Sequence, residues 1–390
     1  MQSMKLQTAF LALLGITLAA CTSVKQVISK KEYMVYVGTY AKPDAEGILA
    51  YRLNEETGTL TKVFGVKAGE NPSFLTLSQD RKNLYAVSET AAYEGQKSGA
   101  VSAFAVDQKT GHLTFLNRQP SLGGAPCYIS LDHQNKVALV ANYVGGNVAA
   151  FQIQPNGHLS APTDMEQHVG KGPKPQQNAA HAHCILPDPK NRFALAVDLG
   201  IDQIISYRLD PAGKLERQAQ PAFTTAPGAG PRHLTFHPNL RFAYVINELN
   251  STLTAFTYNP ETGALTEVAT VSTLPAGYTG ESFCADVHVS QDGRFLYGSN
   301  RGHNSIAVFQ IDSNTNQLTL VEHVSTQGNW PRNFALSPSG KTMLVANQRS
   351  NNITTYKVDT RTGQLTYTGQ STEVAAPVCL QVVPDFPETK

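Results

Sequence analysis

The sequence predicts an all-β protein, a seven-bladed β-propeller with four antiparallel strands in each blade. Three observations point to this fold. A strand–turn–strand pattern recurs six times, and the two ends of the chain supply complementary parts of a seventh unit. The third observation is an absence: after residue 30, no stretch of ten or more residues spaces its apolar side chains at i, i+3 and i+4 as a helix does.

The clearest copy of the pattern runs from Pro231 to Glu248. Two runs rich in β-branched and aromatic residues flank His237-Pro-Asn-Leu, a turn-forming cluster, and this arrangement predicts an antiparallel hairpin. Aligned on Arg241-Phe242, the copies span 73–89, 127–143, 183–199, 232–248, 285–301 and 332–348. Their starts are 54, 56, 49, 53 and 47 residues apart, close to the roughly 40–50 residues of a four-stranded blade.

A second strand pair follows each hairpin. After Glu248 it is Leu253–Tyr258 and Leu265–Val271, joined by residues 259–263, so each unit has four strands. For the seventh unit, Pro377–Val383 supplies the first strand, and the N-terminal segments 33–40, 47–53 and 59–64 supply its partners. Pairing the C-terminal strand with the N-terminal strands closes the ring, which leaves no long exposed sheet edge.

The composition sets limits on domain count and partners. The repeat spans nearly all of the 390 residues, so we expect one large propeller at 33–390. Lys and Arg number 31 against 30 acidic residues, and this balance gives no electrostatic reason to expect binding to nucleic acid.

The first residues are a different kind of sequence. Residues 1–20 combine a short cationic start with an apolar run too short for a comfortable membrane span, as in a secretion signal. Leu18-Ala-Ala-Cys21 resembles the bacterial lipobox, which implies that Cys21 is lipidated and anchors the chain to a membrane. The alternative is a plain signal peptide with a chance cysteine. We expect residues 21–32 to form a tether and the protein to lie in the cell envelope, periplasmic or associated with the outer membrane.

Four further cysteines lie in or at the start of the first strand of different units. They are Cys127, Cys184, Cys284 and Cys379. We expect buried free thiols, because neighbouring inner strands diverge and no Cys-x-x-Cys spacing occurs. Disulfide pairing in an exported protein stays open.

The topology also predicts which residues share a face. If the first strand of a blade runs down through the ring, the second returns, so first-strand starts and second-strand ends meet on one face. The starts are Ser73, Cys127, His183, Arg232, Arg332 and Val378, with His181 and His233 close by; the ends are Tyr40, Glu89, Tyr143, Asp198, Glu248, Arg301 and Gln348. Such an ionic face could bind an anion and carry out acid–base chemistry. The alternative is an ion-pair network that ties blades together.

Several segments resemble a known family. They are Tyr36-Val-Gly-Thr-Tyr40, His181-Ala-His183, Gly228-Ala-Gly-Pro-Arg-His233, Asn247-Glu248-Leu249, Ser299-Asn-Arg-Gly-His303 and Val345-Ala-Asn-Gln348. In order and spacing they resemble the lactonase family of seven-bladed propellers, over residues 33 to 383. That family includes the propeller-type 6-phosphogluconolactonases and the fungal 3-carboxy-cis,cis-muconate lactonizing enzyme.

The resemblance implies a set of site residues. The His, two Arg and Glu implicated in the fungal branch correspond to His183, Arg232, Glu248 and Arg301, and the register with Arg232 selects His183 over His181. We expect further contacts to substrate from six residues: His181, His233, Asn247, His303, Arg332 and Gln348. One departure is Asp286, where many relatives carry Glu.

The expected reaction is hydrolysis of a sugar lactone, phosphorylated or not. Glu248, with or without His183, would take a proton from water, and Arg232 and Arg301 would stabilise the oxyanion. We expect neither metal nor other cofactor. His181 and His183 could form a zinc pair but lack a third ligand, and strand-end asparagines, which could mimic calcium ligands, more often form turns.

Two other functions stay open. A non-catalytic binding or scaffold propeller would use the same face for recognition. A lactone-forming cycloisomerase needs the same base and anion clamp, so the sequence does not separate the two directions of the reaction.

Overall fold

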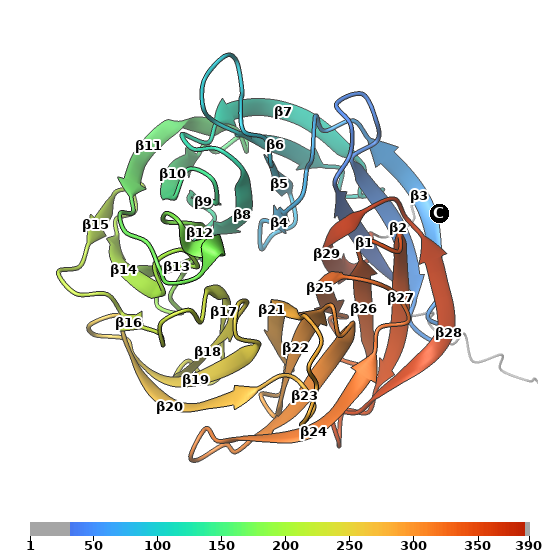
Figure 1. Ribbon diagram of the computed structural model, residues 1–390. Coiled ribbons are helices and arrows are strands. Elements are labelled where there is room, and N and C mark those ends of the chain that lie inside the picture. Colours follow the sequence, from blue (N-terminus) through green and yellow to red (C-terminus); the bar gives the residue numbers. More distant parts are fainter. Residues whose placement is uncertain (1–31, 387–390) are drawn as a thin grey trace, which may run out of the picture. The chain divides into compact units, whose positions relative to one another are not determined.

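Seven antiparallel sheets form a ring in the computed structural model, which describes residues 32–386 (Figure 1). Blade 1 contains β4 (Leu75–Leu77), β5 (Asn83–Ser88), β6 (Ala100–Val106) and β7 (Leu113–Pro120). Blade 2 contains β8 (Pro126–Leu131), β9 (Val137–Asn142), β10 (Asn147–Ile153) and β11 (Leu159–Gln167). Blade 3 contains β12 (Ala182–Pro187), β13 (Phe193–Asp198), β14 (Gln203–Leu209), β15 (Leu215–Arg217) and β16 (Phe223–Thr224).

Blade 4 contains β17 (Pro231–Phe236), β18 (Phe242–Asn247), β19 (Thr252–Asn259) and β20 (Ala264–Ser272). Blade 5 contains β21 (Phe283–Val289), β22 (Phe295–Arg301), β23 (Ser305–Ile311) and β24 (Leu318–Ser325). Blade 6 contains β25 (Pro331–Leu336), β26 (Thr342–Asn347), β27 (Asn352–Val358) and β28 (Leu365–Glu373). Blade 7 joins β29 (Pro377–Pro384) to β1 (Glu32–Thr39), β2 (Ile48–Asn54) and β3 (Leu60–Val66). The predicted fold class and strand order are confirmed.

The ring closes as the sequence predicts. Strand β29 pairs antiparallel with β1, and the register places Val35 opposite Val382 and Gly38 opposite Cys379. Figure 1 shows β29 beside β1 at the inner edge of blade 7, where the other blades have β4, β8, β12, β17, β21 and β25. The pairing hides the edge that an open sheet would present to solvent.

The core lies between neighbouring blades. Strands β9, β13, β18 and β26 are buried along their whole length, because each is covered by the adjacent blade on either side. Outer strands such as β28 alternate between buried and exposed residues. Buried tyrosines also link blades, since the hydroxyl of Tyr85 donates to the carbonyl of Gly157 at 3.0 Å and that of Tyr297 to Gly363 at 3.1 Å.

The departures from the predicted pattern are small. A short 3-10 helix, Pro175–Gln177, lies in the β11–β12 connection, and the outer edge of blade 3 is divided into β15 and β16. The four cysteines predicted as free thiols, Cys127, Cys184, Cys284 and Cys379, are free and buried. Among residues 32–386, no helix is long and apolar enough to cross a membrane. The predicted signal segment and Cys21 lie outside the described residues.

Candidate active site

A cavity of about 250 Å³ opens where the first strands begin and the second strands end. It is lined by Tyr40, Glu89, Cys127, Tyr143, His183, Glu248, Arg301 and Arg332. All eight belong to the set that the topology predicts on this face. Residues more than 290 positions apart in the sequence, Tyr40 and Arg332, therefore line the same cavity wall.

Bulges in the inner strands help to aim these side chains. The pairing register shifts between Pro126 and Tyr128, between Ala182 and Cys184, and between Pro231 and His233, with a further shift between Pro331 and Asn333. The extra residues at these bulges are Cys127, His183, Arg232 and Arg332. Because a bulge puts two residues opposite one, neighbours such as Arg232 and His233 can lie on the same side of the strand, where Nη1 of Arg232 is 3.2 Å from Nε2 of His233.

Glu248 follows the last residue of β18 and receives two arginines on one oxygen. Its Oε2 lies 2.9 Å from Nε of Arg232 and 2.7 Å from Nη2 of Arg301. Each arginine makes its closest contact with Oε2, and the Glu248 side chain, which lines the cavity, is 17% exposed. Burial pushes the pKa of Glu248 upward, but Arg301, Arg232 and then Arg332 outweigh it and hold that pKa below its ordinary value. Glu248 is therefore an ionised carboxylate on the cavity wall.

The backbone of blade 5 fixes both arginines. Arg232 donates from Nη1 to the carbonyl of Ala285 at 2.5 Å, and Arg301 donates from Nη2 to the carbonyl of Cys284 at 2.9 Å. The guanidinium of Arg301 also lies over the ring of Trp330, 5.4 Å from its centroid. Burial and the neighbouring arginines lower the pKa of Arg232 to about 10, which leaves it charged at neutral pH.

Arg332 is the least tightly paired of the three arginines. Its Nη2 lies 3.8 Å from Oε1 of Glu89, and its guanidinium lies over the ring of Tyr40 at 5.4 Å. Glu89 is already occupied, since it accepts hydrogen bonds from the hydroxyls of Tyr40 at 3.0 Å and Ser73 at 2.5 Å. Arg332 therefore presents a cation to the cavity with spare hydrogen-bonding capacity.

His183 forms part of the same wall. Its Nδ1 lies 3.6 Å from the sulfur of Cys127, and the ring packs edge-on against Tyr143 and His233. Burial, and then the positive charge of Arg232, lowers the pKa of His183 well below its ordinary value. The imidazole is therefore neutral at physiological pH.

Behind the cavity, His233 and Asp286 make a second polar layer. Nδ1 of His233 lies 2.8 Å from Oδ1 of Asp286, and Nε2 lies 3.2 Å from Nη1 of Arg232. Burial and Arg232 lower the pKa of His233 to about 4. Asp286 is not among the site residues predicted from the sequence. The sequence offered one sign of its importance: an Asp stands at position 286, where many relatives carry Glu.

The structure brings only one of the six predicted substrate-binding residues, Arg332, to the cavity lining. His233 contacts Arg232 instead. His181 stacks on the outer side of Tyr143 with ring centroids 4.5 Å apart, so it supports a lining residue. Asn247 donates to the hydroxyls of Thr252 and Thr254 within its own blade. His303 contacts Ser305, and Gln348 lies outside the lining.

Conversely, four lining residues are absent from the site residues that the resemblance implies: Tyr40, Glu89, Cys127 and Tyr143. The strand topology places them on this face, but nothing in the repeat distinguishes them chemically. Only contacts such as that of Arg332 with Glu89 show their part in the site.

Metal ligands do not cluster in the described part of the chain. Residues 32–386 contain no group of three or more His, Cys, Asp or Glu side chains placed to hold an ion. The strand-end asparagines donate to acceptors in or near their own blades, as Asn142 does to the carbonyl of Ser121 and Asn300 to that of Thr273. They act as the turn and strand braces that such positions favour.

The chain is similar to known proteins over most of its length. Residues 34–382 match the family described as "Lactonase, 7-bladed beta-propeller". The 6-phosphogluconolactonase of Bacillus subtilis is 41% identical over 309 residues, which make up 79% of this chain and 86% of that protein. That of Formosa agariphila is 34% identical over 78% of this chain and 86% of its own length. The structure of a periplasmic gluconolactonase from Pseudomonas aeruginosa is 33% identical, with a TM-score of 0.84 over 91% of this chain and 100% of that one.

Proposed function

This chain belongs to the lactonase family of seven-bladed β-propellers, and we propose that it hydrolyses a sugar lactone in the cavity beside Glu248. The observation that carries the proposal is the asymmetric environment of the Glu248 carboxylate. Both arginines make their closest contact with Oε2, and Glu248 lines the cavity, so we infer that Oε1 faces the cavity. A fixed, ionised carboxylate with one oxygen toward the cavity suits a general base that positions a water molecule.

In the proposed reaction, water lies between Oε1 of Glu248 and the lactone carbonyl carbon. As the water oxygen bonds to that carbon, its proton passes to Glu248. The tetrahedral intermediate then collapses, the bond from carbon to the ring oxygen breaks, and the ring oxygen takes the proton back from Glu248. The products are the open-chain hydroxy acid and the enzyme in its starting state. A base with a lowered pKa is weak, so orientation by the arginines has to supply much of the rate.

We assign the developing oxyanion to the two arginines that line the cavity, Arg301 and Arg332. Arg332 has only the long contact to Glu89 and can turn toward a carbonyl oxygen without leaving a carboxylate unpaired, because Tyr40 and Ser73 also serve Glu89. Arg232 does not line the cavity and serves to hold Glu248. Charge that develops on the oxygen would thus meet preorganised donors.

The charge balance favours an unphosphorylated lactone. Three arginines face the two carboxylates of Glu89 and Glu248 with His183 neutral, so the site has one positive charge in excess. One excess charge matches a single oxyanion but not a phosphate dianion. The volume of about 250 Å³ is below the roughly 300–1,000 Å³ typical of sites for larger ligands, and this size suits one sugar ring.

The relatives support both forms of the substrate. The Bacillus subtilis relative is named for a phosphorylated lactone, and the Pseudomonas aeruginosa neighbour is named as a periplasmic gluconolactonase. The predicted signal at residues 1–20 agrees with the second, since a phosphate ester formed in the cytoplasm does not ordinarily cross the inner membrane. We therefore propose an aldonolactone as the substrate and an exported, lipid-anchored enzyme.

The proposal is tested by following acid release in a pH-stat with a panel of five- and six-membered lactones. Sugar lactones should be hydrolysed faster than simple aliphatic lactones, and a chelator should leave the rate unchanged. A protein that releases no acid from any lactone above the spontaneous rate contradicts the proposal and favours a binding propeller.

A further inference from the structure

We propose that His233 and Asp286 are positioning residues, which fix the guanidinium of Arg232 and thereby hold Glu248 for catalysis. The inference rests on the proposed function, since it assigns a role within the same site. Neither residue lines the cavity. Both would act through Arg232, whose Nε lies 2.9 Å from Oε2 of Glu248.

Asp286 is the centre of a buried network that joins three blades. Its Oδ1 accepts hydrogen bonds from Nδ1 of His233 at 2.8 Å and from the backbone N–H of Val287 at 3.0 Å. Its Oδ2 accepts from Nε2 of His288 at 2.9 Å and from Nδ2 of Asn333 at 2.5 Å. The backbone N–H of Phe334 also donates to Oδ2, at 3.4 Å. With five donors on two oxygens, the carboxylate cannot rotate without losing several of them.

The donors and acceptors in this network allow a single arrangement of protons. A guanidinium only donates, so Nε2 of His233, which lies 3.2 Å from Nη1 of Arg232, has to accept. The imidazole is neutral, and its proton therefore sits on Nδ1, where it is donated to Asp286. Asp286 in this way selects the histidine tautomer that can hold Arg232.

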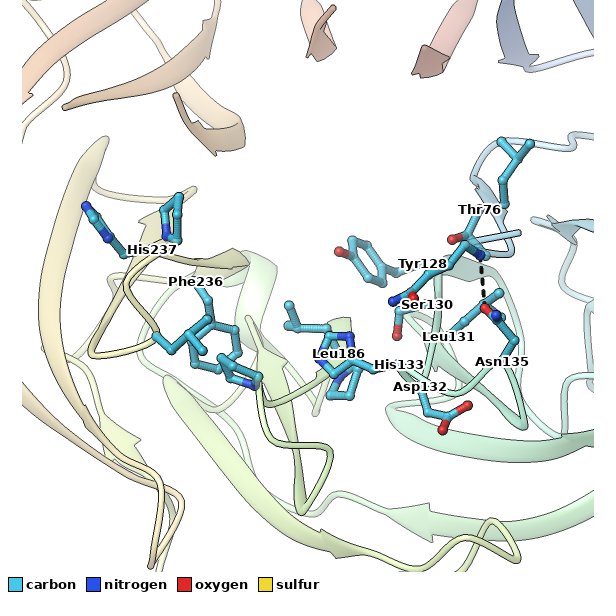
Figure 2. A pocket seen from close by; sticks show the side chains of 16 residues that line it. Thr76, Tyr128, Ser130, Leu131, Asp132, His133, Asn135, Leu186, Phe236 and His237 are labelled. Carbon is cyan, nitrogen blue, oxygen red and sulfur yellow. Dashed lines mark hydrogen bonds between the residues drawn. The ribbon is translucent and has the colours of Figure 1, made fainter. Parts of the chain in front are cut away.

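The network is also closed off from the opposite side of the ring. The ring of Tyr128 lies 5.2 Å from that of His233, and Phe74 packs against both. Beyond Tyr128 is a mainly apolar pocket of about 410 Å³, lined by β4, β8, β12 and β17 and the turns that follow them (Figure 2). These aromatic rings separate His233 from that pocket, so water is poorly placed to replace a hydrogen bond lost at this end of the network. At the other end, the side chain of His288 is 40% exposed.

The isosteric variant Asp286→Asn tests the tautomer directly. Two side-chain donors, from His288 and Asn333, meet at Oδ2, so the amide oxygen has to take that place. The amide NH₂ then faces Nδ1 of His233 and makes it an acceptor. The proton moves to Nε2, where it points at the N–H of Arg232 and displaces the guanidinium. This is the logic by which an Asn in place of a triad Asp selects the wrong tautomer.

We expect two kinetic changes in Asp286→Asn. A displaced base lowers kcat by about 10²-fold with little change in KM, since the cavity wall is intact. Loss of the close positive charge raises the pKa of Glu248, so the acid limb of kcat/KM moves to higher pH. The charged and titratable groups that act on Glu248 are Arg232, Arg301, Arg332, Tyr143 and Cys284, and His183, Glu89 and Cys127 line the same cavity; only Arg232 is displaced.

The control is Asp188→Asn, on the turn between β12 and β13. Asp188 is as buried as Asp286 and accepts hydrogen bonds from Tyr258 at 2.9 Å and the N–H of Phe193 at 2.8 Å. It should lower the melting temperature without moving the acid limb. If Asp286→Asn does not fold, His233→Phe replaces it, because the ring would pack among Phe74 and Tyr128 while removing the acceptor for Arg232.

A readout without turnover separates this inference from the proposed function. Nitrogen-15 NMR of labelled histidines should show His233 as the Nδ1–H tautomer in the unaltered protein and as Nε2–H in Asp286→Asn. Carboxyl carbon-13 titration of Glu248 should show a raised pKa in the variant. If the unaltered protein lacks lactonase activity but Asp286→Asn shows both NMR changes, only the proposed function is contradicted. Unchanged tautomer and unchanged titration in the variant contradict the positioning role, whatever the activity.

Discussion

Nε of Arg232 lies 2.9 Å from Oε2 of Glu248, although sixteen positions separate the two residues in the sequence. They face each other because the hairpin of β17 and β18 pairs Pro231 with Asn247, one residue before each. Arg301 of the next blade reaches the same oxygen at 2.7 Å. The position of the Glu248 carboxylate is thus fixed by strand register within one blade and by packing between two.

The first prediction concerns pH. Protonation of a general base abolishes its action, so a lowered pKa extends activity toward acid. Glu248 has its pKa held below 4.5 by three arginines, and His183 has its pKa held well below 6.5 by burial and Arg232. We expect kcat/KM to be level from neutral pH down to about pH 5 and to fall only below that. An acid limb centred near pH 6.5 would instead indicate a histidine as the base.

The second prediction concerns substrate choice. The single excess positive charge of the site predicts that kcat/KM for gluconolactone equals or exceeds that for its 6-phospho form. Both are measured by acid release at matched ionic strength, since salt screens exposed charges. A preference of about 10²-fold for the phosphorylated form, about 2.7 kcal/mol in transition-state binding, would overturn the charge argument.

The third prediction concerns ring closure. Leu380 on β29 is 3% exposed and packs in the core between blades 6 and 7. Leu380→Ala should lower the free energy of unfolding by about 2–5 kcal/mol, as for other buried leucines, and the melting temperature with it. Leu320→Ala on outer strand β24 is the control, because Leu320 is 48% exposed and its loss should change stability little. Equal effects of the two substitutions would mean that β29 does not close the ring.

The fourth prediction concerns the N-terminal segment, which lies outside the described residues. Cys21→Ala should release the propeller from membranes or block its maturation, because the lipid would have no attachment point. Membrane fractionation and mass spectrometry of the mature chain measure this. An unaltered protein that is fully soluble and carries no lipid would refute the anchor.

The fold could be predicted from the sequence because its inner strands are buried on both faces and repeat at nearly constant spacing. Strands such as β9 and β18 appear as continuous apolar runs, and the turn clusters between them mark the hairpins. The convergence of strand ends then follows from topology alone. It placed all eight cavity residues on the correct face.

The directions of individual side chains could not be predicted so well. Asn247 directly precedes Glu248, and successive residues of a strand point to opposite sides, so it turns into its blade while Glu248 faces the cavity. Bulges break this alternation at Arg232 and His233, and no local pattern marks a bulge. Asp286 was missed for a related reason, since its role depends on donors that three different blades supply.

The most direct measurement of the central claim is the rate of gluconolactone hydrolysis by Glu248→Gln, compared with the unaltered protein in the pH-stat. Gln keeps the shape of the side chain but cannot accept the proton. The fluorescence of Trp330, the only tryptophan in the chain, reports whether the neighbouring Arg301 keeps its place. We predict a loss of about 10² to 10⁴-fold in kcat, with the fluorescence unchanged. A variant that hydrolyses the lactone at the unaltered rate would contradict the assignment of Glu248 as the base.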